Sequence, residues 1–424
     1  MINLIELSWE ERVEISLLCE NFYIQSKKIN KFKPLHKRLL EVVGKEYTKE
    51  LWVFITAACK AVRYGNKGSK FPLSAKRFYE ANKKYKLNIS AEKTSKMLKT
   101  LVAKNYIQMY KGFKDIDSGW SMVSCFIMSD ELLDMIPEDI AKQYALVRQK
   151  EDYVRIKDYK SNTYLTDFKG HSGIRMVMSD MTSLNNFIEK QEIFIDGKQV
   201  RFTYVRIFAD NLKGAGRIYS CNGFMNYESY LRKTITINGE NVTECDYSTI
   251  HPRIIATLKG IQLPVDWDAY QLSEGLLEGS CRKQLRRLAK KAMMCCLYAD
   301  SINTAKKSLY KEFNMNKYKG ADYDKVKISN INDCVSILED LQHNNPELDG
   351  WFYKPDGWKV LQNLDSRLCN FILKEMVHRE EVCLPYHDSW VVCERNRELL
   401  ITLMDKAWIS LFGNNVNFKY DIEF

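Results

Sequence analysis

Apolar residues recur at helical spacing in the N-terminal part of the chain. Within residues 49–63 they share one face, which predicts a helix built on Leu51, Phe54, Ile55, Ala58 and Val62. Residues 1–45 are also amphipathic and are expected to be helical. Two more helices are predicted to begin at the N-cap residues Ser74 and Ser90.

Two β-like runs follow these helices, at residues 106–110 and 120–128. Three helices and a β-ribbon are typical of a winged helix, so residues 1–136 are expected to form a mainly helical, winged-helix-like domain. The last helix carries lysines away from its apolar side, where they suit contacts with nucleic-acid phosphates: Lys93, Lys96 and Lys99. A solvated surface explains the same lysines, and a winged helix can also bind proteins.

The middle of the chain has a weaker pattern. Residues 137–210 are expected to form a connector or thumb-like region, with a hairpin turn at Asp196 and Gly197. No chemistry is assigned to residues 159–190. The motifs that carry chemistry fall almost entirely in residues 211–424, which are expected to form an α+β domain.

One short stretch, residues 243–253, places an acid at the end of a strand. Asp246 follows a predicted strand and precedes Tyr247, Ser248 and the apolar run 254–256. A carboxylate at the edge of a sheet can reach a metal ion, but an Asp at this place is also a common helix N-cap. The stretch by itself leaves both interpretations open.

Two basic elements lie on either side of this stretch. Upstream, Gly214 and Gly216 could let the backbone approach a ligand, and Arg217 beside them could clamp a phosphate. Downstream, four side chains at every fourth position share one helix face: Arg286, Lys290, Met294 and Tyr298. Such a face could grip a triphosphate at one end and contact a base or sugar at the other. A basic, solvated helix surface is the alternative.

A second acid lies in a predicted β-hairpin at residues 382–393. Two apolar runs flank His387, Asp388 and Ser389. Polar residues between two hydrophobic strands are hard to explain by packing, so this turn is a candidate site. Asp388 as an ordinary turn former is the alternative.

Composition narrows the class of protein only slightly. The 424-residue chain has a formal net charge of +10, which favours an anionic partner such as nucleic acid or nucleotide without requiring one. Its 12 cysteines include no Cys-x-x-Cys pair, which argues against structural zinc and for a reducing, cytoplasmic compartment. The charged N-terminus predicts no signal peptide, and no stretch approaches a membrane-spanning length, so no membrane partner is expected.

The motifs, in this order, resemble those of the superfamily that contains the family A DNA polymerases and the single-subunit phage and mitochondrial RNA polymerases. Its motif A is similar to residues 246–248 and its motif C to residues 387–389. The Gly-Arg element that precedes motif A is similar to residues 216–217. Motif B, Arg-x3-Lys-x7-Tyr-Gly, is similar to Arg286, Lys290 and Tyr298, with Ala299 in place of the glycine. The resemblance covers roughly residues 210–424.

This resemblance implies a right-hand polymerase, with an antiparallel palm sheet and helical fingers. Asp246, Asp388 and the carbonyl of Tyr247 would hold two Mg²⁺ ions, with Mn²⁺ as a possible substitute. Lys290 would neutralise or protonate the leaving group. The residues implied to bind nucleotide are Arg286, Lys290, Met294, Tyr298 and His251. Those implied to bind nucleic acid are Arg217 and His387.

The sequence departs from the family pattern at His251. Family A DNA polymerases carry a Glu there that contributes to sugar selection, and the RNA polymerases carry a small residue, so the sugar preference stays open. No acidic cluster resembles a proofreading exonuclease, so no proofreading is expected. A helix predicted over 360–377 would pack on the palm, with Gln362 or Asp365 facing the primer–template.

Three hypotheses follow. The first is a Mg²⁺-dependent DNA polymerase that uses a DNA or RNA template, a primer and nucleoside triphosphates, in a plasmid, phage or mobile element. The second is a primase or RNA polymerase that starts chains de novo, which Met294 and Ser389 favour. The third is a DNA-binding regulator whose palm has lost catalysis.

Overall fold

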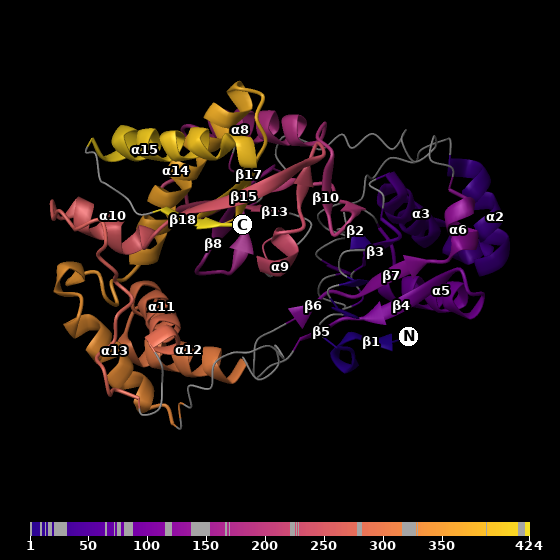
Figure 1. Cartoon of the computed structure of the whole chain (residues 1–424). Coiled ribbons are helices and arrows are strands. Elements are labelled where there is room, and N and C mark those ends of the chain that lie inside the picture. Colours follow the sequence, from indigo (N-terminus) through magenta and orange to yellow (C-terminus); the bar gives the residue numbers. More distant parts are fainter. Residues whose placement is uncertain are drawn as a thin grey trace. The chain divides into compact units, whose positions relative to one another are not determined.

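The computed structural model forms two compact units, Met1–Val147 and Arg148–Phe424 (Figure 1). It describes residues 2–8, 11–12, 14–15, 19–20, 32–63, 66–71, 73, 78–79, 88–114, 121–136, 153–165, 168, 170–220, 225, 227, 229–277, 282–315, 328, 330–386, 388–413 and 420–424.

The first unit packs helices against a small sheet. Its strands follow the order β1-β4-β7-β3-β2, with bounds Ile2–Asn3, Ile107–Lys111, Cys125–Met128, Gly68–Lys70 and Cys19–Glu20. Two further short strands, β5 and β6, form a ribbon over Phe113–Lys114 and Ser121–Met122. The helices are α2 (Lys33–Val43), α3 (Thr48–Arg63), α5 (Ala91–Ala103) and α6 (Asp130–Asp134). One apolar core joins α2, α3, α5, β4 and β7.

Several predicted elements of this unit are confirmed. Helix α3 matches the predicted apolar face, and α5 begins after Ser90, whose side chain accepts a hydrogen bond from the Lys93 amide. The helix predicted to start at Ser74 lies largely outside the described residues. Residues 1–45 are expected from the sequence to be helical. This is wrong at the start of the segment, because Ile2 pairs with Tyr110 of a parallel strand. Pairing with a distant strand here overrides the local amphipathic pattern.

The lysines predicted to bind phosphates lie on the solvent side of α5. Lys93, Lys96 and Lys99 are all exposed, while Met97, Leu98 and Leu101 of the same helix are buried. Lys96 pairs with Glu92 one turn earlier at 2.7 Å, so part of this positive surface is neutralised. Their exposure suits either solvation or contact with an anionic partner.

The second unit contains two larger sheets. The first has the strand order β11-β10-β14-β15-β17-β16, with β18 also paired to β15. The bounds in this order are Lys198–Gln199, Ile193–Ile195, Thr236–Ile237, Glu240–Tyr247, Ser389–Cys393, Cys383–Tyr386 and, for β18, Tyr420–Glu423. The second sheet has the order β13-β12-β8-β9, over Ala215–Ser220, Tyr204–Ala209, Val154–Asp158 and Thr163–Tyr164.

Two groups of helices accompany these sheets (Figure 1). Helices α8 (Ile174–Ile188), α14 (Gly357–His378) and α15 (Arg397–Phe412) pack on the strands, with α14 against β13 and α15 against β15. Helices α11 (Arg282–Tyr298), α12 (Ile302–Met315) and α13 (Asp333–His343) pack on one another. The short helices α9 (Ser229–Arg232) and α10 (Ile250–Leu258) flank β14 and β15. The α+β class is therefore confirmed.

The domain boundary predicted at residue 210 falls inside a sheet. Strand β12 pairs with β13 across this position, with Arg206 opposite Ile218. Strand β12 also pairs in parallel with β8, and α8 lies between the two in sequence. Residues 153–209 therefore belong to the second unit instead of forming a connector, because their strands complete its sheet. The hairpin turn at Asp196 and Gly197 is confirmed, since both have positive φ and Ile195 pairs with Lys198.

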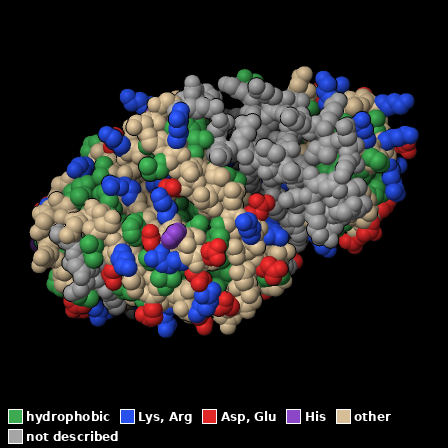
Figure 2. Space-filling model, turned by 90° about the horizontal axis from the view of Figure 1, so that it is seen from above, with side chains coloured by type: hydrophobic (Ala, Val, Ile, Leu, Met, Phe, Trp, Pro, Cys, Tyr) green, Lys and Arg blue, Asp and Glu red, His purple; other side chains and the backbone are tan. Residues whose placement is uncertain are grey.

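None of the helices in the described part of the chain is long and apolar enough to cross a membrane. Figure 2 shows basic and acidic side chains interspersed over the described part of one face.

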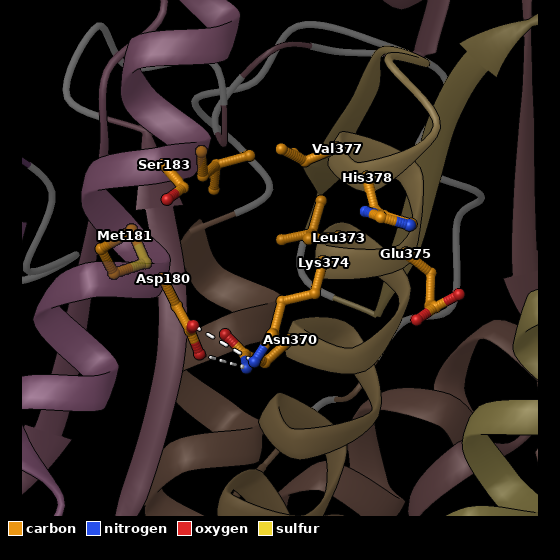
Figure 3. Close-up of a pocket in the computed structure, with 10 residues that line it drawn as sticks. Asp180, Met181, Ser183, Asn370, Leu373, Lys374, Glu375, Val377 and His378 are labelled. Carbon is orange, nitrogen blue, oxygen red and sulfur yellow. Dashed lines mark hydrogen bonds and ion pairs between the residues drawn. The ribbon is translucent and has the colours of Figure 1, made fainter.

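A pocket of about 470 Å³ opens between α8 and α14 in the second unit (Figure 3). Asp180 on α8 accepts a hydrogen bond from Asn370 (3.1 Å) and pairs with Lys374 (3.2 Å), both on α14. Apolar side chains such as Leu184 and Leu373 complete its wall. The residues that line it include none of the predicted site residues, so the candidate chemistry lies elsewhere.

Candidate active site

The two predicted acids meet at one end of the larger sheet. Strand β15 extends through Asp246, which lies opposite Ser389, the first residue of β17. Asp388 immediately precedes Ser389 in the turn that joins β16 to β17. Helix α10 starts at Ile250 with Thr249 as its N-cap, so the interpretation of Asp246 as a helix cap is wrong. The strand register brings two carboxylates from distant parts of the sequence together.

Asp246 lies in an environment that disfavours its charge. Its Oδ1 atom is enclosed and has no hydrogen-bond partner among the residues that the structure describes. Burial, and then the charge of Asp388, hold the pKa of Asp246 well above its usual range, while the cation of Lys290 acts in the opposite direction. A nearby cation would remove this penalty, since it would stabilise the ionised carboxylate.

Helix α11 presents the predicted four-residue face. Arg286, Lys290 and Met294 are exposed and Tyr298 is half-buried, whereas the opposite side buries Leu288 and Ala292 among other apolar residues. The shared face is therefore confirmed. Lys290 of this face is close enough to Asp246 for its charge to lower the pKa of that carboxyl.

Two residues of this site have no counterpart in the predictions. They lie in the loop between α10 and α11, where Asp268 accepts hydrogen bonds from Arg286 Nε at 2.8 Å and Nη2 at 3.4 Å. The ring of Tyr270 lies 5.4 Å from the Arg286 guanidinium and 6.0 Å from Lys290 Nζ. Burial, and then the charges of Asp388 and Asp246, raise the pKa of Tyr270. An isolated Asp-x-Tyr in a loop gives no pattern by which sequence could identify it.

A buried polar network lies beside this cluster. His251 Nε2 lies 2.8 Å from the carboxylate of Asp365, and His251 Nδ1 lies 3.2 Å from the Tyr298 hydroxyl. Arg217 donates to the same Asp365 oxygen from Nε at 2.9 Å and also from Nη2. Burial raises the pKa of Tyr298 to about 12. The network joins β13, α10, α11 and α14. It fixes the side chain of His251, which the resemblance places at the position of sugar selection.

The structure also shows what surrounds two residues of the predicted site region, Asp365 and Gly216. Asp365 is only 5% exposed and binds Arg217 and His251, so of the two candidates for facing a primer–template this one is wrong, and Gln362 stays a prediction. Gly216 has φ of +98°, and a Cβ there would lie 2.7 Å from the ring of Phe208. This glycine therefore serves the packing of its own sheet, because a side chain would not fit.

A second buried ion pair supports the strand that carries Asp246. Glu244 accepts hydrogen bonds from Arg232 Nε at 2.7 Å and from the Ser389 hydroxyl at 2.5 Å. The Arg232 guanidinium lies 4.1 Å from the ring of Tyr386. Glu244 is 4% exposed, so this carboxylate is fully satisfied inside the fold. Ser389 thus ties the two acid-bearing strands together.

The side chain of Tyr247 is part of the buried core. It is 1% exposed, donates a hydrogen bond to the Met404 carbonyl at 2.6 Å, and contacts the rings of Trp390 and Trp408. Any direct role in the site therefore belongs to its backbone. His387 lies outside the described residues.

The donor set suits a hard divalent cation. Asp246 and Asp388 offer carboxylate oxygens, and the unpartnered Oδ1 of Asp246 is the kind of atom that a cation would satisfy. Among the described residues, no group of three or more His, Cys, Asp or Glu side chains is arranged to hold a metal. Such a cation would therefore need ligands beyond the side chains, such as a backbone carbonyl or substrate oxygens.

Comparisons with protein families and with curated proteins find no match for this chain. Among solved structures, it is similar to the POL domain of Pol1 from M. smegmatis, in complex with DNA primer-template and dNTP. The TM-score is 0.28 and the identity 12%. The match covers 94% of this chain and 66% of that chain, so it spans slightly less than two thirds of the Pol1 domain.

Proposed function

We propose that this protein is a template-directed nucleotidyltransferase, a DNA polymerase that resembles family A. One observation carries this proposal: Asp246 and Asp388 meet at a sheet edge beside the cationic face of α11. Paired carboxylates facing a lysine and an arginine suit the transfer of a nucleotidyl group from a triphosphate. The sheet would be the palm and helices α11–α13 the fingers.

The acids would hold Mg²⁺. Asp246 and Asp388 would bind two such ions, with the Tyr247 carbonyl as a further ligand. When bound, these ions would lower the pKa of the primer 3′-hydroxyl and neutralise the triphosphate. Burial beside Asp388 keeps the Asp246 site ready for a cation, since the ionised pair is costly without one.

The face of α11 would bind the nucleotide. Arg286 would hold the triphosphate, and Lys290 Nζ would neutralise or protonate the leaving pyrophosphate. Met294, 44% exposed, would contact the base or sugar, and Tyr298 would lie near the templating base.

Each unit carries residues that are proposed to contact nucleic acid. Arg217 and His387 are proposed to meet the template or primer, and Lys93, Lys96 and Lys99 of α5 to contact phosphates through a winged-helix-like surface. Arg217 would do so with the part of its guanidinium that Asp365 does not use. Two of its nitrogens are already committed to that carboxylate.

The primary test is a four-way incorporation assay. Purified protein is incubated with Mg²⁺ and either dNTPs or NTPs, on a primed or an unprimed single-stranded template. We expect extension of the primed template with dNTPs. Product from NTPs on the unprimed template would instead identify a primase or RNA polymerase. DNA binding with no product in any reaction, template-free ones included, would indicate a regulator without catalysis.

Changing His251 to Glu is expected to shift the sugar preference. His251 is held by Asp365 and Tyr298, so its ring has a fixed position where the resemblance places sugar selection. We expect the ratio of kcat/KM for dATP to that for ATP to change by about tenfold, equivalent to about 1.4 kcal/mol. His343→Glu, on α13, is the control because this residue is outside the network. An unchanged ratio would show that His251 is no gate.

A further inference from the structure

The loop between α10 and α11 contacts the cationic face of α11 through Asp268 and Tyr270. We propose that these two are positioning residues, which hold Arg286 in the orientation that receives the triphosphate of the incoming nucleotide. This inference rests on the proposed function, since it assigns the anion at this face to that nucleotide. It adds two residues to the site that no motif indicates.

The carboxylate of Asp268 fixes one edge of the Arg286 guanidinium. Nε and Nη2 both donate to it, at 2.8 and 3.4 Å, so the planar group is held by a two-point contact. The Asp268 carboxylate also accepts from the Tyr270 amide at 3.1 Å, which fixes its own direction. The Arg286 side chain is 48% exposed, so its other N–H groups remain accessible to a ligand.

The ring of Tyr270 supports the same two cations. Its centroid lies 5.4 Å from the Arg286 guanidinium carbon and 6.0 Å from Lys290 Nζ, distances at which a cation is attracted to an aromatic face. Besides burial, the charges of Asp388 and Asp246 raise the pKa of its hydroxyl, so the ring lies near the acids as well as near the two cations. Tyr270 thus lies beside both of the cations that are proposed to bind the triphosphate.

The loop itself is anchored, so it is suited to positioning. The buried Arg253 donates from Nη2 to the carbonyls of Pro264, Val265 and Trp267, at 3.0, 2.8 and 3.2 Å. On the other side, Asn345 donates to the Ala269 carbonyl at 3.2 Å. Asp268 and Tyr270 therefore lie on a backbone tied to α10 and to the segment after α13. A fixed backbone holds Arg286 at low entropic cost when the anion binds.

A rival interpretation of Asp268 predicts the opposite change in nucleotide affinity. Asp268 could act as a stand-in for the phosphate and compete with it for Arg286. The two interpretations are separated by Asp268→Asn, which keeps the shape of the side chain and removes its charge. A positioning role predicts weaker nucleotide binding, because Arg286 loses its constraint, whereas competition predicts tighter binding.

The experiment measures the Kd for dATP by titration calorimetry, with Ca²⁺ in place of Mg²⁺, and KM and kcat for dATP with Mg²⁺. For Asp268→Asn we expect Kd and KM to rise about three- to tenfold, the cost of one newly mobile side chain, with kcat within about twofold. Asp266→Asn is the matched control, since Asp266 lies exposed in the same loop. It should leave both constants unchanged.

Two changes at Tyr270 test the ring. Tyr270→Phe keeps the aromatic face and should leave Kd within about twofold, whereas Tyr270→Leu should raise it about three- to tenfold. A thermal melt confirms that each variant is folded. If Tyr270→Leu does not fold, the inference is tested by Asp268→Asn alone. Unchanged or tighter dATP binding by Asp268→Asn, or no dATP binding by the wild type, overturns the inference. Loss of the proposed function appears separately, as a wild type that incorporates no nucleotide.

Discussion

Replacing either Asp246 or Asp388 by Asn is expected to reduce nucleotide incorporation by about 10³-fold or more. Each change would remove one proposed anionic ligand of a hard cation, an effect worth several kcal/mol in the transition state. Incorporation of labelled dNTP on a primed template measures it. DNA binding should survive, because the acids lie at the end of the sheet and not on the predicted phosphate-binding surfaces.

The same Asp246→Asn variant should be more stable than the wild type in metal-free buffer, by about 1 kcal/mol. The wild type holds an enclosed carboxylate beside Asp388, and Asn removes that like-charge repulsion while keeping the shape. Thermal unfolding with a chelator present measures the difference. Asp300→Asn, at an exposed position just after α11, is the control and should change neither activity nor stability. Retention of more than about a tenth of wild-type activity in Asp246→Asn would contradict the assignment.

Replacing Asp365 by Ala is expected to destabilise the second unit by about 3–5 kcal/mol. Asp365 binds both Arg217 and His251, and its removal leaves the buried Arg217 guanidinium without its carboxylate partner. Urea unfolding at constant pH measures the loss. Incorporation by the folded fraction should also fall, because His251 loses the contact that fixes its ring.

Two further variants test whether burial of the ion pair is the reason for the large stability loss expected in Asp365→Ala. Lys374→Met removes an ion pair of the same type, to Asp180, but Lys374 is 52% exposed, so we expect a loss below about 1 kcal/mol. The double variant Asp365→Leu/Arg217→Met removes both charges and should recover part of the stability lost in the single variant. Equal losses of unfolding free energy for Asp365→Ala and Lys374→Met would show that the buried network stabilises the unit no more than an exposed ion pair does.

Periodicity in the sequence predicted the elements that depend on local pattern. The exposed face of α11 and the hairpin of β16 and β17 were both predictable, and so was helix α14. In each of these, neighbouring residues decide which side is buried. The first strand, β1, was not predictable, because it exists only through its pairing with β4. The parallel pairing of β12 with β8 was not predictable for a similar reason, since α8 lies between the two strands in the sequence.

The sequence by itself determined which residues could carry chemistry: two acids, a cationic helix face and a histidine at an unusual position. Tertiary structure alone decided that Asp246 faces a neighbouring strand instead of capping α10, since this depends on the pairing of β15 with β17. It also decided that Asp365 is buried against His251, and that the ring of Tyr270 lies 5.4 Å from the Arg286 guanidinium. Such contacts join residues far apart in the chain, and no local pattern of hydrophobic and polar positions encodes them.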